Sequence, residues 1–175
     1  MDERMRNPLR RIAPRAAPIA AGLLFALAVL LVSGRALLAQ SMPIESLNHF
    51  PRTTLTISAH GRVDRFEVWI ANTPARQEQG LMFVRDLPAS KGMLFPEGSP
   101  QVAHFWMENT YIPLDMLFIA GDGRIAKIIA NARPFSTDVL SSDVPVIAVL
   151  EIRGGEAKQL GIAIGDRVSW GKPGA

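Results

Sequence analysis

Short apolar segments with a period of two recur along most of this chain, and they constrain its fold more than any other feature. In TTLTIS (53–58) and RFEVWI (65–70) apolar and polar residues alternate, as in a strand with one buried face. Similar or wholly apolar short segments follow at intervals as far as RVSW (167–170). About seven short strands with one or two short helices predict a mainly β domain, either a β-sandwich or a distorted barrel.

Local signals between these segments predict how they are connected. A Thr-Pro pair at 73–74 is typical of a helix start, and we expect a short helix from there to about Leu81. An Asp-Gly pair at 122–123 between two apolar segments predicts a hairpin. We expect a helical turn at 156–160, and a loop at PEGSPQ (96–101) because Pro and Gly are frequent there.

The first 39 residues differ from the rest of the chain. Five Arg residues precede an uncharged segment at 16–34, which is the pattern of an export signal. The segment is also just long enough to span a bilayer. Residues 1–39 are therefore predicted to be a signal peptide cleaved after Ala39 or a retained N-terminal membrane anchor. Either way the positive-inside rule predicts a periplasmic or other extracytoplasmic location, with residues 40–52 as a linker and 53–171 as the β domain.

Charge and cysteine content exclude several functional classes. Residues 40–175 carry thirteen basic and fourteen acidic side chains, a net charge of −1, and contain no basic run, so we expect no nucleic-acid partner. The absence of Cys excludes disulfides and thiol chemistry. The three His residues lack the spacing of metal ligands, and we expect no metal and no cofactor. The sequence gives no indication of an oligomeric state.

Two acidic residues lie on apolar strands. Asp115 alternates with Leu117 and Ile119, and Glu151 lies within VPVIAVLEI (144–152). An acid on such a strand is costly unless it is paired or hydrogen-bonded. Either the two carboxylates converge for acid–base catalysis or for binding a hard cation, or each accepts backbone N–H groups or pairs with an arginine such as Arg85. We favour the second interpretation.

The segment HFWMENTYIPLDMLFI (104–119) contains the other candidate residues. Asn109 and the Ile-Pro step that follows predict a stiff turn between two strands, which is a sufficient structural explanation. The alternative is a binding rim, in which an aromatic platform lies beside polar groups and a guanidinium anchors an acidic group. The ligand-binding candidates are Arg85, Trp106, Asn109 and Asp115.

Four Met residues offer a further interpretation. Met82, Met93, Met107 and Met116 carry soft thioether groups, which suit Cu(I) outside the cytoplasm. Their spacing is not that of a metal site, however, and Met commonly fills gaps in apolar cores.

Five ordered blocks of sequence resemble the DUF192 family, also called UPF0127. The resemblance extends over residues 53–170, and it implies a mainly β fold and a bacterial protein with an N-terminal signal or membrane segment. It implies no biochemical activity. The blocks are QGLMFVRDL (79–87), KGMLF (91–95), HFWMENTYIPLDMLFI (104–119), VLEIRGG (149–155) and GIAIGDRV (161–168).

These observations predict a non-enzymatic extracytoplasmic domain that binds a small molecule or an envelope partner. The first alternative is an enzyme, a hydrolase or lyase acting on a saccharide or small acid through Asp115 and Glu151. The second is a module that binds copper or a hard cation. If the N-terminal segment is retained, the membrane is a further partner.

Overall fold

The computed structural model describes residues 44–171, so the signal or anchor predicted for residues 1–39 lies outside the described residues. None of the described helices is long and apolar enough to cross a membrane. The elements are η1 (Leu47–His49), β1 (Arg52–Ala59), β2 (Arg62–Ile70), α2 (Pro74–Gln79), β3 (Lys91–Phe105), β4 (Leu114–Ile119), β5 (Ile125–Ala132), β6 (Leu140–Arg153), α3 (Glu156–Gln159) and β7 (Arg167–Trp170).

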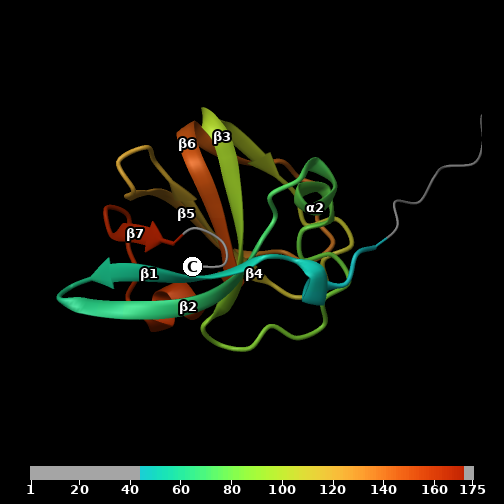
Figure 1. Cartoon of the computed structure of the whole chain (residues 1–175), viewed down its shortest axis with the longest axis horizontal. Helices are drawn as coiled ribbons and strands as arrows, with labels where there is room; N and C mark the ends of the chain where they lie inside the picture. Colours follow the sequence, from blue (N-terminus) through green and yellow to red (C-terminus); the bar gives the residue numbers. More distant parts are fainter. Residues whose placement is uncertain (1–43, 172–175) are drawn as a thin grey trace, which may run out of the picture. The chain divides into compact units, whose positions relative to one another are not determined.

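The seven strands of the described part form one sheet in the order β5-β4-β6-β3-β2-β1-β7. Its two outer strands approach each other where Arg124, just before β5, forms a bridge with Arg167 of β7. Next to this bridge, the Ile125 N–H donates to the Asp166 carbonyl at 2.9 Å. The sheet is therefore curled into a half-barrel, with β5 and β7 near each other and β1 and β2 as a long hairpin (Figure 1). The predicted mainly β fold with about seven strands is confirmed.

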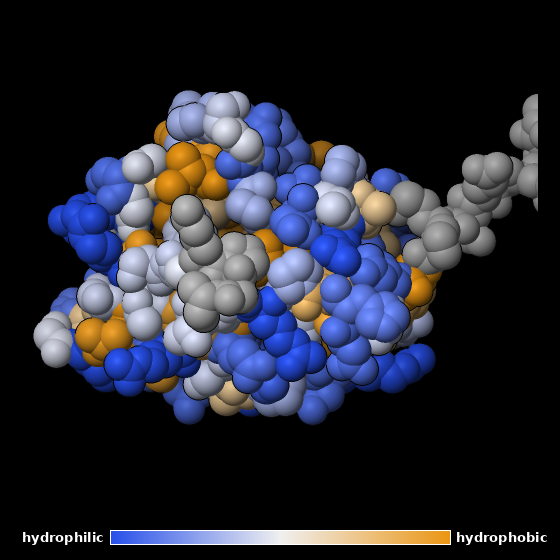
Figure 2. All heavy atoms as spheres, viewed as in Figure 1, coloured by the Kyte–Doolittle hydropathy of each residue, from blue (hydrophilic) through white to orange (hydrophobic). Residues whose placement is uncertain are grey.

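Within the described residues, two apolar clusters lie on opposite faces of the central strands. The inner cluster takes residues from every strand of the sheet, while the outer cluster covers the other face of β3, β4 and β6. Both faces of β4 are covered as a result, and all six of its residues are buried. On the face of the molecule shown in Figure 2, hydrophilic residues predominate and apolar residues form small separate areas. The inner cluster includes Leu55, Phe66, Leu94, Leu117, Ile125, Leu150 and Val168, and the outer one Phe50, Leu81, Leu87, Met93, Phe95, Met116, Phe118 and Val149.

Most local predictions are confirmed. Helix α2 begins at Pro74, and the Thr73 side chain accepts a hydrogen bond from the Arg76 N–H at 3.3 Å. It ends at Gln79 rather than about Leu81, because Gly80 has a φ of +49°. The hairpin between β4 and β5 and the helical turn α3 are present where they were expected.

The loop predicted at PEGSPQ (96–101) is instead part of β3, so this prediction was wrong. Strand β3 pairs with β6 at Gly92–Pro96 and again from Gln101 to Phe105, with register shifts between Pro96 and Gln101 and between Val102 and His104. Bulges of this kind accommodate Pro and Gly within a strand and bend it. Figure 1 shows β3 turning at its upper end, so that its second half runs toward α2.

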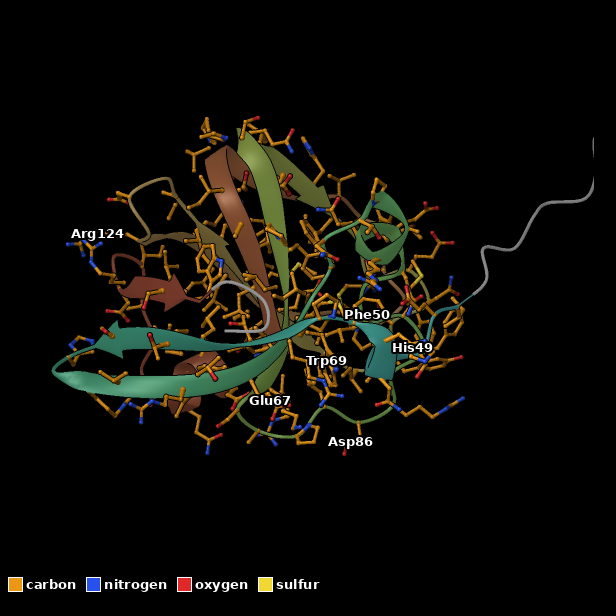
Figure 3. The ribbon with its side chains drawn as sticks, viewed as in Figure 1. His49, Phe50, Glu67, Trp69, Asp86 and Arg124 are labelled. Atoms are coloured by element: carbon orange, nitrogen blue, oxygen red, sulfur yellow. The ribbon has the colours of Figure 1, made fainter. Side chains whose placement is uncertain are left out.

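The segment 44–51, expected to belong to a linker, packs against α2. Gln79, which is buried, accepts a hydrogen bond from the Glu45 N–H at 2.7 Å and donates one to the Glu45 carbonyl at 2.8 Å. The Arg76 guanidinium bonds both carboxylate oxygens of Glu45, at 3.0 and 2.8 Å, and holds the pKa of Glu45 below its usual value. Phe50 is buried in the outer cluster, against which Trp69 also packs (Figure 3). This segment therefore fixes the position of α2.

Candidate ligand-binding site

A pocket of about 470 Å³ lies between α2, the turn that follows it, and the second half of β3. In Figure 1, α2 and the second half of β3 face each other. The volume is in the range of small-molecule sites, which are mostly apolar with a few polar groups. Glu151, from β6, is part of the lining, and the apolar walls are Leu81, Met82, Phe95, Val102, Ala103, Phe105 and Trp106.

The sheet places Glu151 toward this pocket. In the ladder Glu151 is paired with Met93 on β3 and with Met116 on β4, and residues paired in this way share a face. Both Met side chains are fully buried in the outer cluster. Strand β3 approaches closely here because it has Gly92, where an added Cβ would lie 2.4 Å from the Glu151 carbonyl oxygen. The position of Glu151 is thus fixed by its neighbours on both sides.

The carboxyl group of Glu151 lies at the wall of the pocket without a hydrogen-bond partner among the described residues. Glu151 is 4% exposed, and no group within residues 44–171 donates a hydrogen bond to its carboxyl oxygens. Burial raises the pKa of Glu151 from 4.5 to about 8. The side chain is therefore mainly neutral at pH 7, and its hydrogen-bonding capacity is unused by the described protein.

Asp115 has the opposite environment. It is fully buried, and within the described residues its Oδ1 accepts hydrogen bonds from the N–H groups of Asn131 at 2.8 Å and Gly155 at 2.9 Å. Its Oδ2 accepts from the N–H of Ala157 at 2.9 Å. Asp115 precedes Met116, so its side chain points to the face opposite Glu151. The two acids of the carboxylate pair therefore do not converge, and Asp115 joins β5 and the start of α3 to β4.

The other predicted residues are divided between the pocket and its surroundings. Trp106 lines the pocket and is 45% exposed. The Arg85 guanidinium lies instead over the ring of Tyr111, 4.4 Å from its centroid, and bonds neither acid. Asn109 has a φ of +54° and forms the turn after β3. The structure thus brings Trp106 and Glu151 together, and it places Arg85, Asn109 and Asp115 outside the pocket lining.

The Met residues do not form a cluster of exposed thioethers. Met93, Met107 and Met116 are fully buried in the outer cluster, and Met82 lines the pocket. Within residues 44–171, no group of three or more His, Asp or Glu residues could hold a metal ion.

Several lining residues were not predicted to be binding residues, including His104, Glu108 and Thr110, and Met82 was considered only as a copper ligand. Four of the five DUF192 blocks contribute to the lining, with Glu151 coming from the block at 149–155. The sequence signal that could have identified these residues was their position within the family blocks. Four of these blocks, although distant in sequence, meet at this pocket.

The family model of DUF192, described as Uncharacterized ACR, matches residues 55–170. The chain belongs to the DUF192 family. A crystal structure from Sinorhizobium meliloti 1021, described as a "putative transcription regulator (R01717)", is 42% identical with a TM-score of 0.68, and the match covers 69% of this chain and 95% of that one. A crystal structure of a protein of unknown function from Novosphingobium aromaticivorans DSM 12444 is 39% identical with a TM-score of 0.70, and the match covers 75% of this chain and 94% of that one. The search of curated proteins found no match.

Proposed function

We propose that this DUF192 domain is a non-enzymatic binding domain that holds a small ligand in the pocket between α2 and β3. The observation that carries the proposal is Glu151 in the pocket lining, a residue only 4% exposed whose carboxyl group accepts no hydrogen bond from the described residues. A buried polar group without a partner costs stability, and a strongly raised pKa in a concave site is typical of functional residues.

The pocket combines the two features that ligand recognition needs. Its apolar walls, among them Phe105 and Met82, remove apolar ligand surface from water. Trp106, half exposed, is placed to cover a ring or alkyl chain from the solvent side. Glu151 then supplies the polar contact that would orient the ligand.

Two other functions have less support. Asp115 and Glu151 point to opposite faces of the sheet, so the hydrolase or lyase hypothesis lacks its carboxylate pair. The description of the Sinorhizobium relative as a transcription regulator is not extended to this chain, because residues 40–175 carry a net charge of −1. Binding to DNA depends on neutralising phosphates with Lys and Arg.

A variant that fills the pocket tests the proposal. Met82 lines the pocket and is only partly buried, so Met82→Trp should occupy the ligand volume without disturbing the core. Val139→Trp, at an exposed position outside the pocket lining, is the matched control. A small-molecule library is screened by thermal shift against the full chain. A ligand at about 100 times its Kd stabilises the folded state by about 2.7 kcal/mol.

Compounds that bind should raise the midpoint of thermal unfolding by several degrees in the wild type and in Val139→Trp. They should raise it much less in Met82→Trp. Hits that stabilise all three proteins equally would place binding elsewhere. A broad library without a single hit would overturn the proposal.

We further propose that the domain acts outside the cytoplasm. The support is the basic segment and the uncharged segment that follows it at 16–34, together with predicted cleavage after Ala39. Cell fractionation with intact-mass measurement tests this. The protein should be recovered in the periplasmic or membrane fraction, and a mass lacking residues 1–39 would identify a cleaved signal. Recovery of the full-length chain in the cytoplasm would overturn the proposed location.

A further inference from the structure

We infer that the ligand of this pocket is an organic cation, a protonated amine attached to an apolar or aromatic body. The inference rests on the proposed function and names the chemical class of its ligand. It depends on the charge of the lining, on the unused hydrogen bonds of Glu151, and on the aromatic walls.

The charge of the lining favours a cation. Four glutamates belong to the lining: Glu78 from α2, Glu97 from β3 and Glu108 from the turn after β3, together with Glu151 at the sheet, which ionises only when a cation binds. No Lys or Arg is found among the described residues of the lining, and His104 is its one potentially basic side chain. A concave surface with charge of one sign concentrates ligands of the opposite sign.

The hydrogen-bonding capacity of Glu151 provides independent support. The side chain is 4% exposed, lines the pocket, and receives no hydrogen bond from the described residues. An ammonium group offers three N–H donors, whereas a carboxylate offers acceptors only. Hydrogen bonds between ionised partners are short and about twice as strong as neutral ones. An amine would therefore satisfy the carboxylate that the protein leaves unpaired.

The aromatic walls suit the same ligand. Phe95 and Phe105 pack edge to face with centroids 5.0 Å apart, and Trp106 lies next to Phe105 in the sequence. Aromatic faces attract cations, and Trp does so most strongly. The volume of about 470 Å³ accommodates an amine with a ring or short chain.

Binding of such a cation has a measurable proton balance. In the free protein at pH 7 Glu151 holds a proton, because its pKa is about 8. A bound ammonium favours the ionised carboxylate, so Glu151 releases one proton while the amine keeps its own. Affinity should therefore fall about tenfold for each pH unit by which the pH is lowered below about pH 8. The other titratable groups of the lining, Glu78, Glu97, His104 and Glu108, are the same for every probe.

Isothermal titration calorimetry of the full chain tests the inference with three probes of matched shape: phenylethylamine, phenylethanol and phenylpropionate. Titrations at about pH 7 in phosphate and in Tris, which differ in ionisation enthalpy, give the number of protons released. We expect phenylethylamine to bind at least about tenfold more tightly than either other probe, with release of close to one proton. Phenylethanol should release none.

Glu151→Gln should remove both the preference for the amine and the proton release. Glu67→Gln is the matched control, because Glu67 is an exposed carboxylate on β2 outside the pocket lining (Figure 3). Proton release is measured on the wild type, so the inference remains testable if Glu151→Gln does not fold. Equal binding of phenylethanol, or tighter binding of phenylpropionate, would overturn the inference of a cationic ligand. It would still support the proposal that the pocket binds a ligand. If none of the probes binds, the inference of a cationic ligand is also overturned. The proposal of a ligand-binding pocket is then tested separately by the thermal-shift screen with Met82→Trp.

Discussion

Asp115 and Glu151 are both acids on strands of the central sheet, yet their surroundings differ completely. Within the described residues, Asp115 accepts hydrogen bonds from three backbone N–H groups, and Glu151 accepts none. The first acid joins elements of the fold, while the second has a hydrogen-bonding capacity that no described residue uses. Burial of an acid does not by itself indicate a site. The number of partners that the protein supplies is the informative quantity.

The same contrast extends to the two faces of the sheet. The inner face, toward which Asp115 points, is filled by side chains from every described strand. The outer face, toward which Glu151 points, is covered by α2, the turn after it and the bent half of β3, and these leave a pocket. On the outer face, the pocket lining is therefore the part in which side chains such as Met82 and Trp106 can vary without disturbing the buried cluster beneath it.

Asp115→Ala tests the structural side of this contrast and should have the largest effect. Three backbone N–H groups lose their acceptor, one of them the buried N–H of Ala157 and two of them partly buried, and each unpaired buried group costs about 1–3 kcal/mol. We expect the free energy of unfolding in urea to fall by at least about 3 kcal/mol. Asp86→Ala, in the loop after α2 at an exposed position (Figure 3), is the control and should change little. A loss below about 1 kcal/mol for Asp115→Ala would contradict its structural role.

Glu151→Gln tests whether the Glu151 carboxyl group is protonated in the folded protein, through the pH dependence of stability. Between pH 4.5 and about 8 folded Glu151 keeps a proton that the unfolded chain has released, so stability falls as pH rises and levels off above about pH 8. The slope is about 1.4 kcal/mol per pH unit, or roughly 2–3 kcal/mol between about pH 5.5 and 7.5.

Glu151→Gln cannot titrate, so its stability relative to wild type should increase by that amount over the same interval. Urea titrations of both proteins across this range provide the measurement. A difference that stays constant with pH would show that Glu151 is ionised in the folded protein.

Arg85→Ala should have the smallest effect. The guanidinium contacts the Tyr111 ring at an exposed site, and such a contact is worth about 0.5–1 kcal/mol. Because Arg85 is outside the pocket lining, ligand affinity should be unchanged. Trp106→Ala is the matched comparison, and it should weaken binding of the same ligand with little change in stability. A loss of affinity in Arg85→Ala would extend the site beyond the pocket.

Much of the fold was predictable from local pattern. The period of two in segments such as 53–58 gave the strands, and the Thr-Pro pair at 73–74 gave the start of α2. PEGSPQ (96–101) was missed because its Pro and Gly residues favour turns locally, whereas pairing with β6 and a register shift keep it in β3. That information is tertiary, and no local window contains it.

The candidate site was predictable only in part. The apolar strands identified Glu151 and Asp115 as unusual acids, and the segment 104–119 identified Trp106 as a binding candidate. Which acid was satisfied could not be predicted, because the partners of Asp115 are backbone N–H groups, which every residue except Pro possesses. The wall formed by α2 was missed for a similar reason, since it depends on contacts with the segment around Glu45.

The pairing of β7 with β1 has a consequence for how the domain is made. The last described strand completes the sheet beside the first, with Trp170 opposite Leu55. Synthesis proceeds from the N-terminus, so β1 lacks this neighbour until nearly the whole domain has been produced. Contacts between such distant segments form slowly, because a long loop must close first. Until β7 has been made, the edge of β1 in the nascent sheet therefore has no strand beside it, and its backbone groups on that side must be hydrated.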